Sequence, residues 1–506
     1  MTNILKKRYV LNLKLETEKF QEDILSKRFE IGRCLYNSIL GKALSRYNEM
    51  TKTRRWRENQ ANISEIYKLE KDRTKTNKLL REYYKLKKDM LNEYRLNEYS
   101  LHKDIKKMQH KFNENIDSFT AQKIASRVWR SLNDNLFGKG ERVHFKNSNQ
   151  GLNSLEGKSN KTGIRYKKDK NILEWNKLSI KVQSKLNDYE LKSLEDRVCY
   201  CRIKRIFVRG KYKYILQLIL EGIPPLKVNK ETGIIKHPLG IGNIGIDIGT
   251  QTLAYVSDKD VKLYELAPRV QDIEAEKRLI QRYMDRSKKA SNPDNYDKNG
   301  KIKQGIEINW HYSNKYKKAR DRLKNICRKQ ADIRRMDHNI MSNMILSIGD
   351  TVLVEKMNYS RLQSRFKETI KNEKTCKVSK KKRFGKSIAN KAPAMFLTIL
   401  SNKLKARGGY YLEVNTYKIK ASQYNHLNHE YIKKKLSERW NYFNYEGNII
   451  KVQRDIYSAY LIKNVNEDLE TINSYKCTRD FDWFLELHNK EIERLQVLEN
   501  VSSVGV

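Results

Sequence analysis

Three segments in the second half of the chain are rich in apolar residues, which predicts that they are buried, and each of them carries one acidic residue. Asp247 interrupts the run NIGIDIGTQTLAYV, Glu355 ends the run TVLVE, and Asp455 opens the segment RDIYSAYLIKN. The first two runs are typical of buried strands, whereas the third has helical spacing of its apolar residues. An ionised carboxylate enclosed by apolar side chains costs several kcal/mol unless a cation or hydrogen-bond donors meet it. Any fold of this chain must provide such partners.

Each of these acids also has a local explanation. Asp247 can cap the turn GTQT that follows it, and Asp455 can accept hydrogen bonds from the free N–H groups at the start of a helix. One shared site explains all three acids at once, whereas the local explanations need a separate reason for each. Two predicted strands and one predicted helix supply the acids in the order Asp, Glu, Asp. RNase H-like nucleases have this arrangement, and their carboxylates bind two Mg²⁺ ions about 4 Å apart. Oxygen ligands without His or Cys favour Mg²⁺, or Mn²⁺, over Zn²⁺.

The charge of the chain points to a polyanionic partner. The sequence has 105 Lys and Arg against 60 Asp and Glu, a formal net charge of +45, which argues against an ordinary metabolic enzyme and favours nucleic acid as the partner. With 38% apolar residues the chain can still bury a core. Six scattered cysteines and the lack of a long apolar run lead us to expect a cytoplasmic, nucleoid-associated protein of a prokaryote without a membrane span.

Hydrophobic periodicity divides the chain into parts. Residues 9–15 alternate as a half-buried strand, the following hundred or so residues have helical spacing, and β-branched, alternating segments return after a Gly- and Asn-rich stretch. We expect a multidomain α+β protein, in which a small β-barrel with a helical insert precedes an RNase H-like α/β domain. The expected parts are a barrel from residues 1–15 and 140–235, a helical domain at 16–139, a nuclease domain at 240–463 and an acidic helical extension at 464–506.

Three motifs carry a resemblance to a known family. GIDIGTQTLAYV, VLVEKMN and QRDIYSAYLI resemble the three RuvC motifs of TnpB-type RNA-guided nucleases, which are transposon-encoded, and of the related compact type V CRISPR effectors. RCLYNSIL at 33–40 is similar to the first helix of their recognition lobe, DRSKKASNP at 285–293 to the insertion after the first RuvC strands, and LSER at 436–439 to their zinc-finger region. The motifs occur in the family's order.

The resemblance implies a function, a site and partners. Asp247, Glu355 and Asp455 correspond to catalytic metal ligands, with Mg²⁺ (or Mn²⁺) as cofactor. The barrel corresponds to the wedge domain, residues 16–139 to the recognition domain, and residues from about 240 to the RuvC domain. The implied partners are target double-stranded DNA and a guide RNA, from a transposon end or a CRISPR array, bound by a monomer.

The sequence departs from the family in the insert at about 416–450. TnpB proteins usually carry two zinc-binding cysteine pairs there, whereas this segment has no Cys, and two histidines alone make a poor zinc site. We expect no zinc, with aromatic side chains stabilising the insert instead: Tyr424, Trp440, Tyr442 and Phe443. In the third motif the family's common Asp-x-Asn becomes Asp455-Ile456-Tyr457.

Basic segments supply the candidates for nucleic-acid binding. Residues 360–407 have a net charge of +13 and follow the second acid directly, so we expect them to guide a single strand to the site. Tyrosines interleaved with bases on a predicted helix suit base stacking, although a solvated helix face explains them equally well. The candidates are Arg361, Arg365, Lys380, Lys381, Lys382, Arg383, Tyr83 and Tyr84.

These observations favour an RNA-guided DNA endonuclease with a single two-metal site. Two alternatives remain open at this point: an RNA-guided DNA-binding repressor that does not cut, and a DNA transposase, which also uses an Asp/Glu triad.

Overall fold

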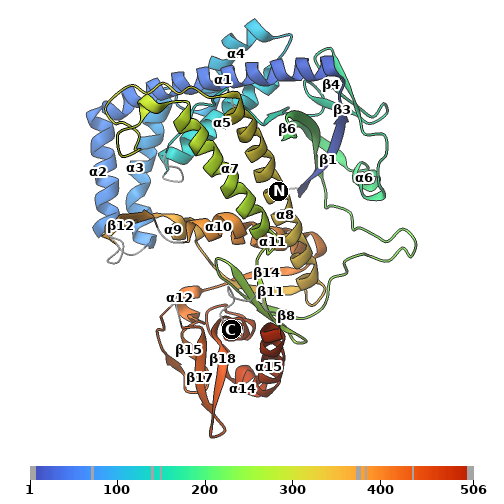
Figure 1. Cartoon of the computed structure of the whole chain (residues 1–506), viewed down its shortest axis with the longest axis vertical. Coiled ribbons are helices and arrows are strands. Elements are labelled where there is room, and N and C mark those ends of the chain that lie inside the picture. The colour runs from blue at the N-terminus through green and yellow to red at the C-terminus, as the bar shows by residue number, and fades with distance from the viewer. Residues whose placement is uncertain are drawn as a thin grey trace. The chain divides into compact units, whose positions relative to one another are not determined.

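The chain divides into two compact units, Met1–Leu226 and Lys227–Val506. The computed structural model, shown in Figure 1, describes residues 7–69, 73–137, 142–148, 151–371, 378–381, 384–435 and 438–497. Each unit contains helices and a sheet and has its own buried apolar core. The expected multidomain α+β content is confirmed. No helix among the described residues is long and apolar enough to cross a membrane.

A curled, antiparallel seven-stranded sheet forms the centre of the first unit. Its hydrogen-bonded order is β2-β6-β7-β1-β5-β4-β3. The strands are β1 (Arg8–Glu16), β2 (Ser154–Glu156), β3 (Arg165–Lys167), β4 (Ile172–Trp175), β5 (Leu178–Val182), β6 (Arg197–Val208) and β7 (Lys211–Glu221), with the short helix α6 (Asp188–Ser193) before β6. Strands β2 and β3 are edges among the described residues, so hydrogen bonding does not close the expected barrel. Asn160 instead links β3 to β6, because its side chain bonds the backbone of Tyr166 and the Sγ of Cys201.

The helical insert packs on this sheet. It comprises α1 (Lys19–Lys52), α2 (Arg54–Leu69), α3 (Arg73–Glu93), α4 (Glu98–Gln109), η1 (His110–Phe112) and α5 (Ser118–Leu136). A capping box between Glu18 and Gln21 starts α1. Asp117 caps α5 and also accepts a hydrogen bond from the indole of Trp175 in β4, at 2.9 Å. The insert and the sheet therefore share one core.

The second unit contains a five-stranded mixed sheet in the order β10-β9-β8-β11-β14. Strands β8 (Asn243–Ile248), β9 (Thr252–Val256) and β10 (Val261–Glu265) form an antiparallel meander, and β11 (Thr351–Glu355) and β14 (Tyr410–Val414) continue it in parallel with β8. Between the strands lie α7 (Val270–Ala290), η2 (Pro293–Asn295), α8 (Asn314–Leu346), α9 (Tyr359–Gln363), β12 (Arg365–Lys371), β13 (Val378–Lys381), α10 (Gly385–Lys391) and α11 (Pro393–Arg407).

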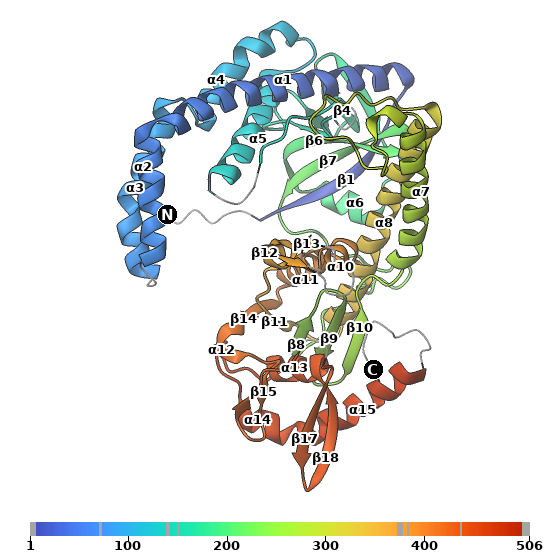
Figure 2. The same cartoon turned by 60° about the vertical axis from the view of Figure 1, so that its left-hand side comes forward.

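The remaining elements follow β14. They are α12 (Thr416–Ile419), β15 (Tyr424–Asn425), β16 (Glu430–Tyr431), β17 (Trp440–Tyr445), β18 (Asn448–Gln453), α13 (Arg454–Lys463), α14 (Ser474–Arg479) and α15 (Phe481–Val497). Figure 2 shows α13 and α15 beside the meander β8–β10, with the hairpin β17–β18 next to them.

Side-chain alternation gives the sheet of the second unit two different faces. Ile244, Ile246 and Ile248 of β8 pack with α8 and α11 on one face. Gly245 lies on the other face, against α13, where an added Cβ would stand 2.2 Å from the carbonyl oxygen of Ala459. The backbone of α13 can approach β8 this closely only because residue 245 has no side chain.

Candidate active site

Two neighbouring strands bring Asp247 and Glu355 together. The parallel register pairs Leu353 of β11 with Gly245 of β8, and its continuation by two residues places Glu355 beside Asp247. The period of two puts both carboxylates on the face that α13 covers, since Ile246 and Val354 point into the opposite core. Like charges directly opposite each other on adjacent strands repel. The strands thus hold two acids where each destabilises the ionised form of the other.

Burial reinforces this repulsion. The pKa of Asp247 is raised well above its usual value, first by burial and then by the charges of Asp455 and Glu355. The nearby guanidinium of Arg454 lowers it only in part. Burial also raises the pKa of Glu355 to about 7. Neither acid forms an ion pair with a Lys or Arg among the described residues, so negative charge at this point lacks a full counter-charge.

The third acid reaches the same face from the first turn of α13. Asp455 contacts two arginines: its Oδ1 lies 3.2 Å from Nη2 of Arg454, and its Oδ2 lies 3.5 Å from Nη1 of Arg439. Gln453 caps the helix by accepting a hydrogen bond from the N–H of Ile456 at 2.8 Å, so Asp455 is not the cap residue. The local explanation of Asp455 as a helix cap is therefore wrong.

The residues present fit a divalent cation. In the part of the chain that the structure describes, no three His, Cys, Asp or Glu side chains are already arranged as a complete set of metal ligands. Asp455 is turned toward its arginines, whereas Asp247 and Glu355 form a half-buried pair with raised pKa values. A cation between β8, β11 and α13 would remove the repulsion and draw Asp455 from contacts that are long for charge-assisted hydrogen bonds.

Sequence reasoning missed three residues around these acids. Arg439 and Arg454 both contact Asp455. Arg454 could have been found from the sequence because it directly precedes Asp455, whereas Arg439 is 16 residues away. Tyr359 begins α9 and is buried, and its hydroxyl donates to the carbonyl of Ile248 at 3.4 Å. Burial and the charge of Asp247 raise the pKa of this tyrosine. Tyr359 thus ties the segment after β11 to the end of β8.

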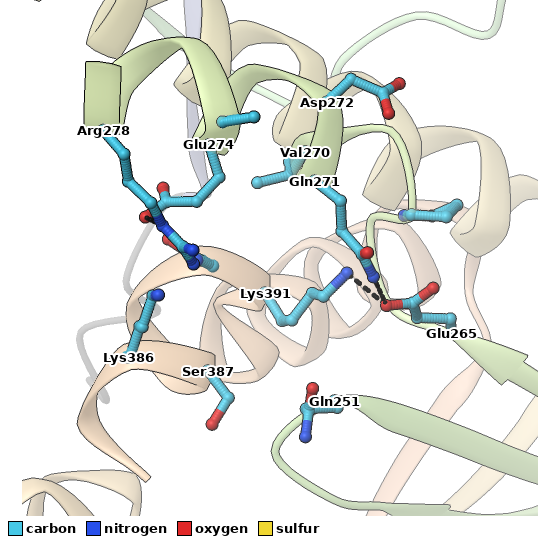
Figure 3. Close-up of a pocket in the computed structure, with 13 residues that line it drawn as sticks. Gln251, Glu265, Val270, Gln271, Asp272, Glu274, Arg278, Lys386, Ser387 and Lys391 are labelled. Carbon is cyan, nitrogen blue, oxygen red and sulfur yellow. Dashed lines mark hydrogen bonds and ion pairs between the residues drawn. The ribbon is translucent and has the colours of Figure 1, made fainter. Parts of the chain in front are cut away.

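A polar cleft of about 970 Å³ lies near the turn that joins β8 to β9. Figure 3 shows Lys391 pointing toward Glu265, whose Oε1 it contacts at 2.6 Å, and Gln271 reaching the same carboxylate. Lys386 and Arg278 add positive charge, and Asp272 and Glu274 add negative charge. The lining therefore has mixed charge and differs from the uniformly basic groove expected for a phosphate backbone.

The basic candidates after β11 lie partly in a hairpin. Arg361 is exposed in α9, Arg365 falls in β12, and Lys380 and Lys381 fall in β13, which pairs antiparallel with β12. Lys382 and Arg383 lie outside the described residues. Part of the basic segment is thus built on a pair of strands.

The two candidate tyrosines belong to the first unit. Tyr84 is exposed on α3, and its hydroxyl lies 3.0 Å from that of Tyr67 on α2. Tyr83 is half-buried, and its carbonyl accepts a hydrogen bond from the side chain of Asn59. Tyr84 therefore offers a ring to a partner, whereas Tyr83 serves mainly the packing of α2 on α3.

The aromatic core of the insert differs from the expected one. Tyr424 and Phe443 are buried, but Tyr442 is 65% exposed, because alternation along β17 turns it away from Phe443. Trp440 also lies off this core and stacks under Lys451. The centre is instead His426, whose backbone N–H and Nδ1 both contact the hydroxyl of Tyr457, at 3.2 and 2.7 Å. Further rings come from α13 and α15: Tyr460, Phe481 and Phe484.

Comparisons with known proteins give structural similarities at low sequence identity. No family model and no curated protein matches the chain. Among solved structures, the chain is similar to one described as a cryo-EM structure of the Cas12f1–sgRNA–target DNA complex, with 11% identity and a TM-score of 0.39, covering 90% of this chain and 98% of that one. It is also similar to one described as a cryo-EM structure of a CRISPR-Cas12f ternary complex, with 14% identity and a TM-score of 0.26, covering 89% and 86%. The functional assignment rests on the acids themselves.

Proposed function

We propose that this chain is an RNA-guided DNA endonuclease with one metal-dependent site, formed by Asp247, Glu355 and Asp455. The observation that carries the proposal is the convergence of these three acids, from β8, β11 and α13, on one face of the sheet. The strand order, an antiparallel meander continued by two parallel strands, supports an RNase H-like (RuvC) domain. Half-buried acids that lack a full counter-charge suit a cation better than a purely structural role.

In this proposal the three acids hold Mg²⁺ or Mn²⁺. Bound metal would supply activation of the attacking water and stabilisation of the leaving oxygen of the phosphodiester. The chain positions the ligands: the register of β8 and β11 fixes Asp247 beside Glu355, and Gln453 fixes the start of α13. Arg439 and Arg454 hold the carboxylate of Asp455 through its two oxygens in the metal-free protein, and Asp455 would turn from them to bind the metal.

The partners follow from charge and from the motif resemblance. A net charge of +45 suits a polyanion carried by the protein. The RuvC-like motifs and their flanks support a guide RNA, from a transposon end or a CRISPR array, that pairs with target DNA beside a short flanking sequence read by the protein. We propose that one chain acts with one guide RNA.

The test begins with the RNA that copurifies with the chain. The chain is expressed with its native flanking DNA, the bound RNA is sequenced, and a plasmid carrying the matching sequence and a library of flanking sequences is incubated with the complex and Mg²⁺. We expect cleavage by the wild-type complex and none by Asp247→Ala, with RNA binding unchanged. Asp294→Ala, which removes an exposed acid of the same unit, is the matched control and should cut normally.

The outcomes separate the candidate functions. Normal cutting by Asp247→Ala would refute the site. Specific DNA binding without cutting by the wild-type complex would favour a repressor, and joined rather than broken products would indicate a transposase.

A further inference from the structure

The C-terminal helix α15 contacts the corner at which β18 turns into α13. This corner is Gln453, the last residue of β18, and it is fully buried. Its backbone N–H donates to Nε2 of His488 in α15, at 3.0 Å. Its side chain caps α13 through the N–H of Ile456. The backbone N–H of Gln453 is thus bound to α15 and its Oε1 to the helix that carries Asp455, while its buried Nε2 has no hydrogen-bond partner among the described residues.

The ring of His488 is set up to accept this hydrogen bond. Nδ1 lies 2.9 Å from Oδ1 of the neighbouring Asn489, which places the ring proton on Nδ1 and leaves the Nε2 lone pair for Gln453. The side chain is 1% exposed, so water cannot replace it as acceptor. Loss of His488 would leave the N–H of Gln453 buried without a partner.

The same helix is anchored to the edge of the sheet. Glu491, one turn after His488, is fully buried and accepts a hydrogen bond from the N–H of Leu263 in β10 at 2.9 Å. Lys262 and Arg494 neutralise its charge, at 3.3 and 2.5 Å. Helix α15 therefore connects the edge strand of the sheet with the start of α13 through buried polar contacts on both sides.

Aromatic packing fixes α15 along α13 as well. Phe484 stacks on Tyr460 of α13 with ring centroids 4.2 Å apart, and Phe481 packs on the ring of His426 with centroids 4.6 Å apart. Movement of α15 would therefore shift α13 together with the corner. Asp455, two residues after Gln453, would move with them.

We infer that His488 is a positioning residue for the proposed reaction, which holds the start of α13 so that Asp455 faces Asp247 and Glu355. The inference rests on the proposed function for the role of Asp455, but the contact of His488 with Gln453 can be tested without cleavage. Partners that orient metal ligands typically change metal affinity 10- to 100-fold. We therefore expect an effect on metal binding beyond any effect on folding.

Two substitutions at His488 separate the effect of losing the hydrogen-bond acceptor from the effect of losing the packed ring. His488→Phe keeps a ring in the buried site but removes the lone pair, whereas His488→Gln offers a carbonyl oxygen at a reach similar to that of Nε2. Leu400→Ala is the control, because this buried residue of α11 lies in the core on the opposite face of the sheet and its loss destabilises the unit without touching α15.

The experiment measures Mn²⁺ binding by calorimetry and amide hydrogen exchange in the peptide covering 453–461, on the full chain. We expect His488→Phe to weaken Mn²⁺ binding by about 10-fold or more and to speed exchange in this peptide, with both recovered in His488→Gln. Leu400→Ala should lower the unfolding midpoint at least as much while leaving the Mn²⁺ affinity and the exchange unchanged.

The possible failures differ. Unchanged Mn²⁺ affinity in His488→Phe, or the same loss in Leu400→Ala, would overturn the positioning role. If wild type and Asp247→Ala bind Mn²⁺ alike, the proposed metal site is refuted instead. The contact is then judged by exchange alone, and unchanged exchange in His488→Phe would overturn it.

Discussion

Replacing Glu355 by Gln should stabilise the metal-free protein while abolishing cleavage. Glu355 lies beside Asp247 on the neighbouring strand, and burial raises its pKa to about 7. An unfolded glutamate has a pKa near 4.5. The folded state therefore disfavours the ionised form of this residue, and glutamine removes the carboxylate while keeping its size.

The magnitude follows from these two pKa values. Each pKa unit corresponds to about 1.4 kcal/mol, so above pH 7 the ionised Glu355 costs the folded state about 3 kcal/mol. The folded protein binds more protons than the unfolded one between pH 4.5 and about 7, so stability falls as the pH rises through this window. The advantage of Glu355→Gln should be absent at pH 4 and complete at pH 8. For a unit of this size it corresponds to roughly 5–10 °C in the unfolding midpoint.

The assay is thermal unfolding in EDTA and in Mg²⁺, at pH 4 and pH 8. In EDTA at pH 8 the variant should unfold at a higher temperature than wild type. In Mg²⁺ the difference between the two unfolding temperatures should become smaller. The wild type gains about 2.7 kcal/mol of stability at a metal concentration 100 times the Kd, and the variant gains less. Glu413→Gln removes an exposed carboxylate from the adjacent strand β14 and should change neither result. Equal stability of variant and wild type in EDTA at pH 8, or an equal advantage at both pH values, would refute the reasoning.

Three further substitutions or conditions test other parts of the structure. Tyr457→Phe should lower the free energy of unfolding by about 1–3 kcal/mol in urea titrations, because it leaves the buried N–H of His426 unpaired, whereas Tyr442→Phe, at an exposed ring, should have almost no effect. Gly245→Ala should reduce both stability and Mn²⁺ affinity, since its Cβ would force α13 away from β8; a variant that binds Mn²⁺ normally would contradict the close packing seen here. The logarithm of the binding constant for the copurified RNA should fall linearly with the logarithm of the salt concentration, as measured by filter binding. A binding constant that does not change with salt would argue against phosphate contacts.

Local sequence patterns were enough to place the acids on their elements. Asp247 lies in β8, Glu355 ends β11 and Asp455 stands in the first turn of α13, because short apolar runs and helical spacing are local signals. The first strand and the helical insert after it were likewise predictable from periodicity.

Contacts between segments that are distant in the sequence could not be predicted from local periodicity. Periodicity along 440–445 does not say which face of the hairpin is covered, so Tyr442 was assigned to a core that it does not enter. The acidic extension was predicted as a helix, but its sequence does not indicate that Glu491 is fully buried and neutralised by Lys262 of β10 and Arg494 of its own helix. Both features depend on which elements pack together, which one sequence does not state.

The place of α15 in the chain bears on when the site can form during synthesis. Strands β8 and β11, with two of the three acids, are made long before residues 481–497, whose His488 contacts the start of α13 and whose Glu491 contacts β10. A ribosome-bound chain that already contains Asp455 still lacks these contacts. Because domains generally fold as units as they emerge, an incomplete chain would carry the three acids before α15 could fix the start of α13, and the proposed nuclease activity would then begin only after translation has passed this helix.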